Sequence, residues 1–259
     1  MKASSRAAVV SSFTLIKGAM VHESYAVFSA WDLDSSKREN LDRLRRDNFI
    51  GTRSAAWLRD IAKVLNRRFD PGGRDRALVV LAQNRCPLDE WRPILLWHIT
   101  RDEFLLRDFL INWLYVRFEA GVLRLRPEEL NDFLLSLRDR GGETEHDWSE
   151  ATLRRVAAGL LKAAAEFGLL RGSAAKEFAS YHLPERSFLY LLHAMRDEHV
   201  NPARVISSPD WQMFLLAPSD VESELLRLHQ YRKLQYEAAG TLLELTLPYQ
   251  TALQFAEAV

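Results

Sequence analysis

The sequence contains a single cysteine, Cys86. An intrachain disulfide is therefore impossible, a zinc site with four cysteine ligands is excluded, and a reducing compartment such as the cytoplasm is expected. Long apolar runs are missing too. Outside residues 7–16, the longest stretch without Asp, Glu, Lys or Arg is 245–256, twelve residues that include Pro248, whereas a membrane-spanning helix needs about 20 apolar residues. Lys17 follows residues 7–16 without a cleavage-type segment, so we expect neither a signal peptide nor membrane association.

Signatures of common enzymes are also absent from the sequence. There is no Gly-rich phosphate loop or dinucleotide fingerprint, and none of the seven histidines forms a metalloprotease pair. No serine lies in a nucleophile elbow. Asp210, Glu222 and Glu224 partly match a nuclease carboxylate set, but the lysine that should follow is missing. We therefore expect a protein with no catalytic activity, metal or cofactor.

Net charge is zero, whereas a protein that coats nucleic acid through bulk charge is usually strongly basic. The distribution of charge is uneven, however. Residues 1–76 contain 15 basic and 9 acidic side chains, and the remaining residues contain 20 basic and 26 acidic ones. Residues 37–76 alone contain 12 basic and 6 acidic side chains. This asymmetry predicts one basic face and one acidic face. The alternative is an ordinary solvated helix surface.

Glycine and proline are sparse, at 11 and 9 residues, and they fall between segments of helical periodicity. The sequence predicts an all-α, multi-helix fold with at most one short strand or wing, the strand lying at 241–247. The expected helices are 18–30, 35–46, 52–69, 74–84, 88–99, 100–120, 127–141, 149–167, 184–198, 209–216 and 220–239. The double glycine Gly141-Gly142 predicts a boundary between an N-terminal domain, 1–142, and a C-terminal domain, 143–259.

Helix starts and stops support these assignments. Ser35-Ser36 is expected to open one helix, Thr52 to cap the next, and Gly240 to end the helix at 220–239. Capping boxes are expected at the pairs Thr100/Glu103, Asp147/Glu150 and Ser219/Glu222, because a hydroxyl or carboxylate followed three residues later by Glu can satisfy free backbone amides at a helix start.

The basic region 37–76 contains a candidate DNA-binding segment. Residues 41–68 are predicted to form a helix, a short turn with Gly51, and a second helix, the spacing of a helix-turn-helix. Arg43, Arg45 and Arg46 precede the turn, and Arg53, Arg59, Lys63, Arg67 and Arg68 are expected to project from the second helix. Arg53 lies near that helix's N-terminus, where backbone amides favour a phosphate. The alternative is that carboxylates such as Asp60 neutralise these arginines.

A second candidate lies at 147–172, in a winged-helix-like segment. Its helix has an apolar stripe at Leu153, Val156, Ala157, Leu160, Leu161 and Ala164. Arg154, Arg155 and Lys162 lie off that stripe, and the chain reversal after Glu166 resembles the start of a wing. The alternative is a core helix with solvated basic residues. Both segments are expected to contact phosphates, which position a duplex without reading its sequence.

Several short motifs occur in an order that resembles the BrxA family of bacteriophage-exclusion (BREX) defence systems. The motifs are residues 12–19, Glu23, 48–53, Trp148-Ser149 with Thr152, 167–170, 211–216 and 220–222, so the resemblance spans about Ser12 to Pro248. It implies an all-helical protein with NusB-like and helix-turn-helix similarity, which binds double-stranded DNA without catalysis and acts with other BREX proteins. The neutral net charge departs from that expectation. Two alternatives stay open: a protein–protein adaptor within the BREX complex, and RNA binding through a NusB-like fold.

Overall fold

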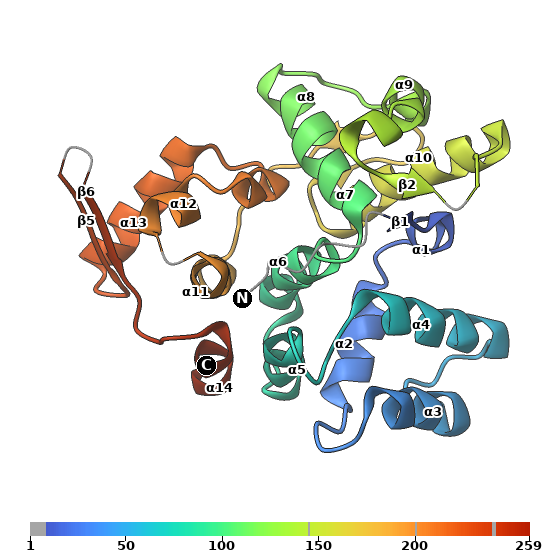
Figure 1. The fold of residues 1–259 in the computed structure, drawn as a ribbon, viewed down its shortest axis with the longest axis horizontal. Coiled ribbons are helices and arrows are strands. Elements are labelled where there is room, and N and C mark those ends of the chain that lie inside the picture. Colours follow the sequence, from blue (N-terminus) through green and yellow to red (C-terminus); the bar gives the residue numbers. More distant parts are fainter. Residues whose placement is uncertain (1–8, 145, 200, 240–241) are drawn as a thin grey trace.

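A computed structural model describes residues 9–144, 146–199, 201–239 and 242–259, and it shows a mostly helical protein (Figure 1). The N-terminal helices are α1 (Ser12–Lys17), α2 (Val21–Ser29), α3 (Lys37–Asp47), α4 (Ala55–Arg68), α5 (Arg76–Gln83) and α6 (Leu88–Ile99). Then come α7 (Phe104–Asp108), a π-helical segment (Phe109–Tyr115), α8 (Val116–Glu119), α9 (Asn131–Leu135) and α10 (Glu150–Glu166). The last helices are α11 (Glu185–Glu198), α12 (Pro202–Ile206), α13 (Pro218–Gln230) and α14 (Ala252–Ala258). Short 3-10 turns lie at Pro127–Leu130, Arg138–Arg140 and Pro209–Phe214.

The strands are short and occur in pairs. β1 (Val9–Val10) pairs in parallel with β2 (Glu143–Thr144). β3 (Leu170–Arg171) and β4 (Glu177–Phe178) form an antiparallel pair directly after α10, where a wing-like reversal was expected. β5 (Gln235–Ala239) and β6 (Leu242–Thr246) form a longer hairpin. The helical fold class is confirmed, but the expectation of at most one short strand underestimated this content, because two-residue pairs leave no periodic signal in the sequence.

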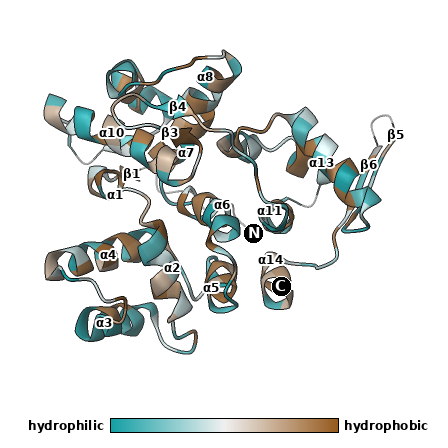
Figure 2. Cartoon of the chain, turned by 180° about the vertical axis from the view of Figure 1, so that it is seen from behind, coloured by the Kyte–Doolittle hydropathy of each residue, from teal (hydrophilic) through white to brown (hydrophobic). Residues whose placement is uncertain are grey.

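Helix α6 lies at the centre of the fold (Figure 1). Eight of its residues are buried, with Trp91, Ile94 and Leu95 fully so. It packs against α5 and α11, and one continuous core cluster includes residues from both sides of Gly141-Gly142. By contrast, α3 has only three buried residues and is mostly hydrophilic (Figure 2). Elements on the two sides of the double glycine therefore share one core.

One expected helix was wrong in its second half. The segment 220–239 is helical only to Gln230, and residues 235–239 form β5. The helix ends because Arg232 adopts a positive φ of 57° and the Lys233 amide donates back to the Leu228 carbonyl at 3.0 Å, a reversal typical of helix C-termini. The stop expected at Gly240 lies outside the described residues.

The expected capping boxes were also wrong at three positions, whereas Ser36 caps α3 with Glu39 as expected from Ser35-Ser36. None of the other three expected pairs forms a capping box. The Thr100 hydroxyl donates to the Trp97 carbonyl, and Glu103 pairs with Arg68. Asp147 accepts from Arg138. Helix α13 begins two residues earlier than expected, at Pro218, and Asp220 accepts from the Ala217 amide. Tertiary partners outweighed local capping at the first two of these sites.

Gly159 is the point where α10 meets α1. A Cβ atom at this position would lie 2.6 Å from the Leu15 carbonyl oxygen. The Leu15 carbonyl belongs to the backbone of α1, and a Cβ atom would be fixed to the backbone of α10, so the contact could be relieved only by shifting a helix. Gly159 is therefore required by the close approach of the two helices and not by its backbone conformation.

We expect Gly159→Val to destabilise the protein by about 1–3 kcal/mol, because the added methyl groups force α1 away from α10. Urea unfolding monitored by circular dichroism measures this change. Ala158→Val is the matched control, since Ala158 is exposed on the same helix and its replacement costs only helix propensity, about 0.5 kcal/mol. Equal losses for the two variants would contradict the close-approach argument.

Candidate nucleic-acid interface

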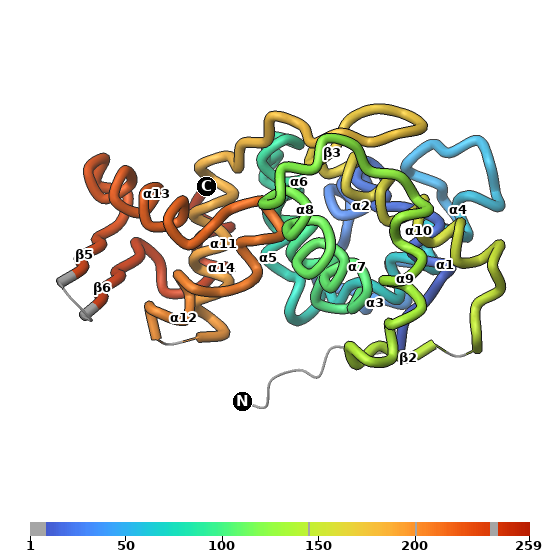
Figure 3. Tube along the Cα trace, turned by 90° about the horizontal axis from the view of Figure 1, so that it is seen from above, coloured from blue at the N-terminus to red at the C-terminus, as the bar shows by residue number. Residues whose placement is uncertain are grey.

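Helix α1 lies between α4 and α10, the two helices that carry most of the predicted DNA contacts (Figures 1 and 3). On the α4 side, the Lys17 ammonium is 2.5 Å from the Asp60 carboxylate. On the α10 side, the Glu166 carboxylate accepts from the Ala19 amide at 2.6 Å, and Gly159 contacts α1 directly. These contacts fix α4 and α10 on opposite sides of one short helix.

The exposed side of α4 carries Arg59, Lys63 and Arg67. Arg59 has no ion-pair partner within the described part of the chain. The Lys63 ammonium lies 4.2 Å from the centre of the Phe13 ring, and Arg67 donates to the Val9 carbonyl at 2.6 Å. Asp60, which the alternative interpretation has neutralising this face, is paired with Lys17. Among the described residues, no carboxylate therefore neutralises these three cations.

The side of α10 that faces α1 carries Arg155 and Lys162. Positions 155, 159, 162 and 166 repeat at four and three residues and so lie on one helix face, which is the face that contacts α1 through Gly159 and Glu166. Arg155 is exposed and forms no ion pair with a described residue. Lys162 lies 3.5 Å from Glu166. Arg154 lies off this face, 3.9 Å from Glu150.

The structure thus brings part of the two predicted segments together. Arg59, Lys63 and Arg67 lie on one side of α1, and Arg155 and Lys162 lie on the other; we call these five residues the basic rows. Helix α3 packs against α4 on the side away from α1 and α10 (Figure 1). Its arginines therefore lie apart from the basic rows.

The arginines before the turn have local partners. Arg45 pairs with Asp42 at 2.9 Å and Arg46 with Asp47 at 2.7 Å, which is the alternative that the sequence left open. Arg43 donates to the Ala30 carbonyl and to Asn40, and its guanidinium lies 5.4 Å from the centre of the Phe49 ring. A duplex would have to compete with these contacts.

Arg53 does not project from α4 as expected. The helix begins at Ala55 with Ser54 as its cap, the Ser54 hydroxyl accepting from the Trp57 amide at 3.1 Å. Thr52, the expected cap, instead closes the preceding turn through two hydrogen bonds with the Asn48 side chain. Arg53 is exposed just ahead of the cap.

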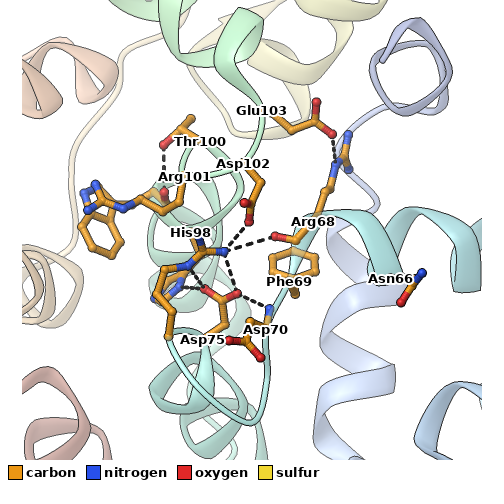
Figure 4. A network of polar contacts seen from close by, with 12 residues as sticks. Asn66, Arg68, Phe69, Asp70, Asp75, His98, Thr100, Arg101, Asp102 and Glu103 are labelled. Atoms are coloured by element: carbon orange, nitrogen blue, oxygen red, sulfur yellow. Dashed lines mark hydrogen bonds and ion pairs between the residues drawn. The ribbon is translucent and has the colours of Figure 1, made fainter. Parts of the chain in front are cut away.

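Arg68 was predicted to contact DNA, and this prediction is wrong, because its side chain is only 2% exposed. The guanidinium pairs with Glu103 at 3.0 Å (Figure 4). It also donates to the carbonyls of Thr14, Gly18 and Ala19. Arg68 therefore holds the end of α1 against α4, and the charge that the sequence assigned to the surface lies in the interior.

A buried polar network continues from this point (Figure 4). Asp75 accepts from Arg74 and contacts His98 at 2.5 Å, and the other ring nitrogen of His98 lies 2.7 Å from the Tyr190 hydroxyl. Burial lowers the pKa of His98 below its usual value, so the imidazole is held neutral. Burial alone would raise the pKa of Asp75, but hydrogen bonds from His98 and Arg74 outweigh it and hold that pKa low.

This network is built for stability. Burial raises the pKa of Tyr190 well above its usual range, so the three side chains form a hydrogen-bonded chain with one charge, that of Asp75, compensated by Arg74. All of Asp75, His98 and Tyr190 are at most 1% exposed. No substrate could reach them without opening the core.

A surface cavity of about 590 Å³ opens beside the basic rows. Lys63, Asn66 and Arg67 line it from α4, residues 10–14 line it from the start of α1, and residues 146–148 with Thr152 line it from the start of α10. Sequence reasoning missed Asn66 and Thr152. The spacing of Asn66, three residues after Lys63, was the signal that would have placed it on the same face.

Among the residues described, no group of three or more His, Cys, Asp or Glu side chains is arranged to hold a metal ion. Within the same ranges, none of the helices combines the length and the hydropathy that crossing a bilayer requires.

The fold and the site define a class: a mostly helical protein in which two cation-bearing helices are held on either side of a third. The particular family follows from comparison with known proteins. The BrxA family model matches residues 12–194, and the chain belongs to the BrxA family, which gives it a BREX-associated role. No curated protein matches the chain. The family match ends within α11, so α12, α13, the β5–β6 hairpin and α14 lie beyond it.

Proposed function

We propose that the protein is a non-catalytic, cytoplasmic DNA-binding component of a BREX system, which contacts the phosphates of a duplex through the basic rows. The observation that carries this proposal is the placement of cations from α4 and α10 on both sides of α1. In the described part of the chain, Arg59, Lys63 and Arg67 on α4 and Arg155 on α10 have no carboxylate partner. Arginine suits this role, because its planar fork matches phosphate oxygens.

Two elements resemble known DNA-contacting motifs and are part of the proposal. Helices α3 and α4 with their intervening turn serve as the helix-turn-helix-like unit, and α10 with the β3–β4 pair serves as the winged-helix-like unit. Affinity is expected to be moderate, since the chain as a whole is neutral. It should fall steeply with salt, because phosphate binding releases counterions.

A mobility-shift titration of a generic duplex at two salt concentrations tests the proposal. The double variant Arg59→Glu/Arg155→Glu should weaken binding at least about tenfold, because a repelled phosphate replaces an attracted one on each row. It should also reduce the salt slope by about two, one for each lost contact. Arg204→Glu is the matched control: Arg204 is exposed on α12, on the far side of the molecule from α4 and α10 (Figures 1 and 3).

The outcomes distinguish DNA binding through the basic rows from its alternatives. Equal weakening by Arg204→Glu would show that bulk charge, and not the basic rows, drives binding. Absence of a shift at micromolar protein would favour the adaptor function, which the acidic excess of residues 77–259 supports as a surface for a basic partner protein. Tighter binding of an RNA competitor than of duplex DNA would favour RNA recognition instead.

A further inference from the structure

The cavity between α1, α4 and α10 has a lining that favours an anion. Its two cations, Lys63 and Arg67, form no ion pair with any carboxylate in the described ranges. The acidic side chain that also lines it, Asp147, is already paired with Arg138 at 2.6 Å. Within the described residues, the two positive charges at this cavity therefore have no carboxylate partner; Arg67 donates to the Val9 carbonyl and Lys63 lies over the Phe13 ring.

Some polar side chains at the same cavity also have no hydrogen-bond partner among the described residues. The side-chain hydroxyl of Ser12 and the amide of Asn66 make no hydrogen bond with the described part of the chain, and Ser11 precedes α1 without capping it through its side chain. Asn66 lies apart from the buried network around Arg68 (Figure 4). Hydroxyl and amide groups are typical phosphate ligands beside Lys and Arg.

The volume and the lining of the cavity suit a ligand larger than a simple ion. The volume of about 590 Å³ lies within the range of small-molecule sites. The partly buried rings of Phe13 and Trp148 supply an apolar wall beside the cations. A ligand that combines an anionic group with a flat, partly apolar group fits this lining, and a nucleotide has this combination.

We propose that the cavity receives a single nucleotide, with its phosphate at Lys63 and Arg67 and its base against the wall formed by Phe13 and Trp148. This inference rests on the proposed function, because the cavity opens between the basic rows that would hold a duplex. A paired base reaches the cavity only at the cost of breaking its pair and its stacking, a few kcal/mol. An unpaired nucleotide can reach it more easily, since extruding it costs little compared with breaking a base pair.

The nucleotide can come from the bound duplex or from solution, and two arms of one experiment separate these sources. The first compares binding of a matched duplex with binding of the same duplex carrying one unpaired central nucleotide. We expect about tenfold tighter binding of the bulged duplex, the gain that base stacking typically provides. The second arm titrates the protein with a free deoxynucleoside monophosphate by calorimetry, where binding in the absence of DNA would assign a soluble nucleotide as ligand.

Variants assign any preference to the cavity. Asn66→Trp adds bulk at an exposed position that lines it and should abolish both the preference for the bulged duplex and the binding of free nucleotide. Ala56→Trp is the matched control, because Ala56 is exposed on the same helix and does not line the cavity. The ratio of bulged to matched affinity is the readout, so an effect of either tryptophan on duplex binding cancels.

The results separate the two proposals. Equal affinity for both duplexes, with no binding of free nucleotide, would overturn the nucleotide site and leave duplex binding intact. Failure to bind the matched duplex, with retained binding of free nucleotide that Asn66→Trp removes, would overturn the proposed function and leave the site. A preference that survives in Asn66→Trp would place the unpaired nucleotide elsewhere.

Discussion

Arg68→Ala is expected to destabilise the protein by about 3–5 kcal/mol, because it leaves a buried carboxylate without its partner. Glu103 is 2% exposed and pairs with Arg68 at 3.0 Å. The same guanidinium donates to the carbonyls of Thr14, Gly18 and Ala19, which surround the end of α1. Removal of Arg68 therefore leaves a charge and three carbonyls without their donor in one place.

Urea unfolding gives this free energy directly, provided that the dependence on denaturant stays constant between variants. Arg67→Ala is the matched control. Its side chain is the same and its position is adjacent, but Arg67 is exposed and donates only to the Val9 carbonyl. We expect it to cost less than about 1 kcal/mol in stability while weakening duplex binding. Similar stability losses for the two variants would contradict the structural role of Arg68.

A second pair of variants separates the ion pair from the carbonyl contacts. Arg68→Met/Glu103→Leu removes both charges, so no isolated carboxylate remains in the core. We expect this double variant to recover part of the loss, since replacing both partners of a buried pair by apolar groups is often nearly neutral. Recovery should stay incomplete, because the carbonyls at the end of α1 still lack donors.

The difference between Arg67 and Arg68 also shows how far the sequence could lead. Helical spacing places Arg68 three residues after Leu65 and seven after Ile61, on the apolar face of α4, and both of those residues are buried. The helical periodicity of the sequence therefore indicated that Arg68 is buried. What it could not supply was Glu103, whose position 35 residues away depends on how the helices pack. A run of arginines indicates charge, but only a tertiary partner decides which of them reaches the solvent.

Helix α10 illustrates what periodicity predicts well. Its apolar stripe was assigned correctly at Val156, Ala157, Leu160 and Leu161, all of them buried, because a long amphipathic helix repeats the same signal over several turns. The segment 231–239 illustrates the opposite case. Its residues suit a helix by composition, yet Gln235–Ala239 pairs with β6. Cross-strand pairing is a tertiary property that outweighs weak local propensity.

The candidate site followed the same division. The sequence identified the two basic segments, and the structure places only their α4 and α10 residues on the two sides of α1. The cavity could not be predicted, because residues from positions 10–14, 63–67 and 146–152 line it. Those segments meet only because α1 lies between α4 and α10. Convergence of distant segments on a short helix leaves no pattern within any one of them.

Asp210 is one of the contacts that join the part of the chain beyond the family match to the rest; another is the hydrogen bond from the Asn84 side chain to the Ala256 carbonyl at 3.0 Å. Its carboxylate accepts from the Trp97 indole at 3.1 Å, from Arg101 at 3.2 Å and from Arg107 at 2.5 Å. All three donors lie within the matched range of 12–194, and Asp210 lies outside it. Asp210, which is 5% exposed, thus accepts hydrogen bonds from α6 and from the segment after it.

We expect Asp210→Ala to destabilise the protein by about 3–5 kcal/mol, since Arg101 loses a partner in a buried setting and the Trp97 indole loses its acceptor. Asp210→Asn should lose less, because an amide oxygen still accepts one hydrogen bond while the charge is gone. Asp220→Ala is the matched control on exposed α13, where loss of the carboxylate that accepts from the Ala217 amide should cost about 1 kcal/mol.

Thermal unfolding ranks the three variants, and limited proteolysis shows where the structure opens. If Asp210 joins the two parts, cleavage in Asp210→Ala should begin between residues 195 and 217, before the matched region is cut, because that segment loses its contacts with α6 and α7.

A second consequence concerns duplex binding. Arg59 and Arg155 lie on α4 and α10, whereas the donors to Asp210 named above lie on α6 and the segment after it. The duplex affinity of the folded variant should therefore equal that of the parent protein. A parallel loss of duplex binding at temperatures where the variant remains folded would mean that the C-terminal part contributes to the nucleic-acid surface, contrary to the placement of the basic rows on α4 and α10.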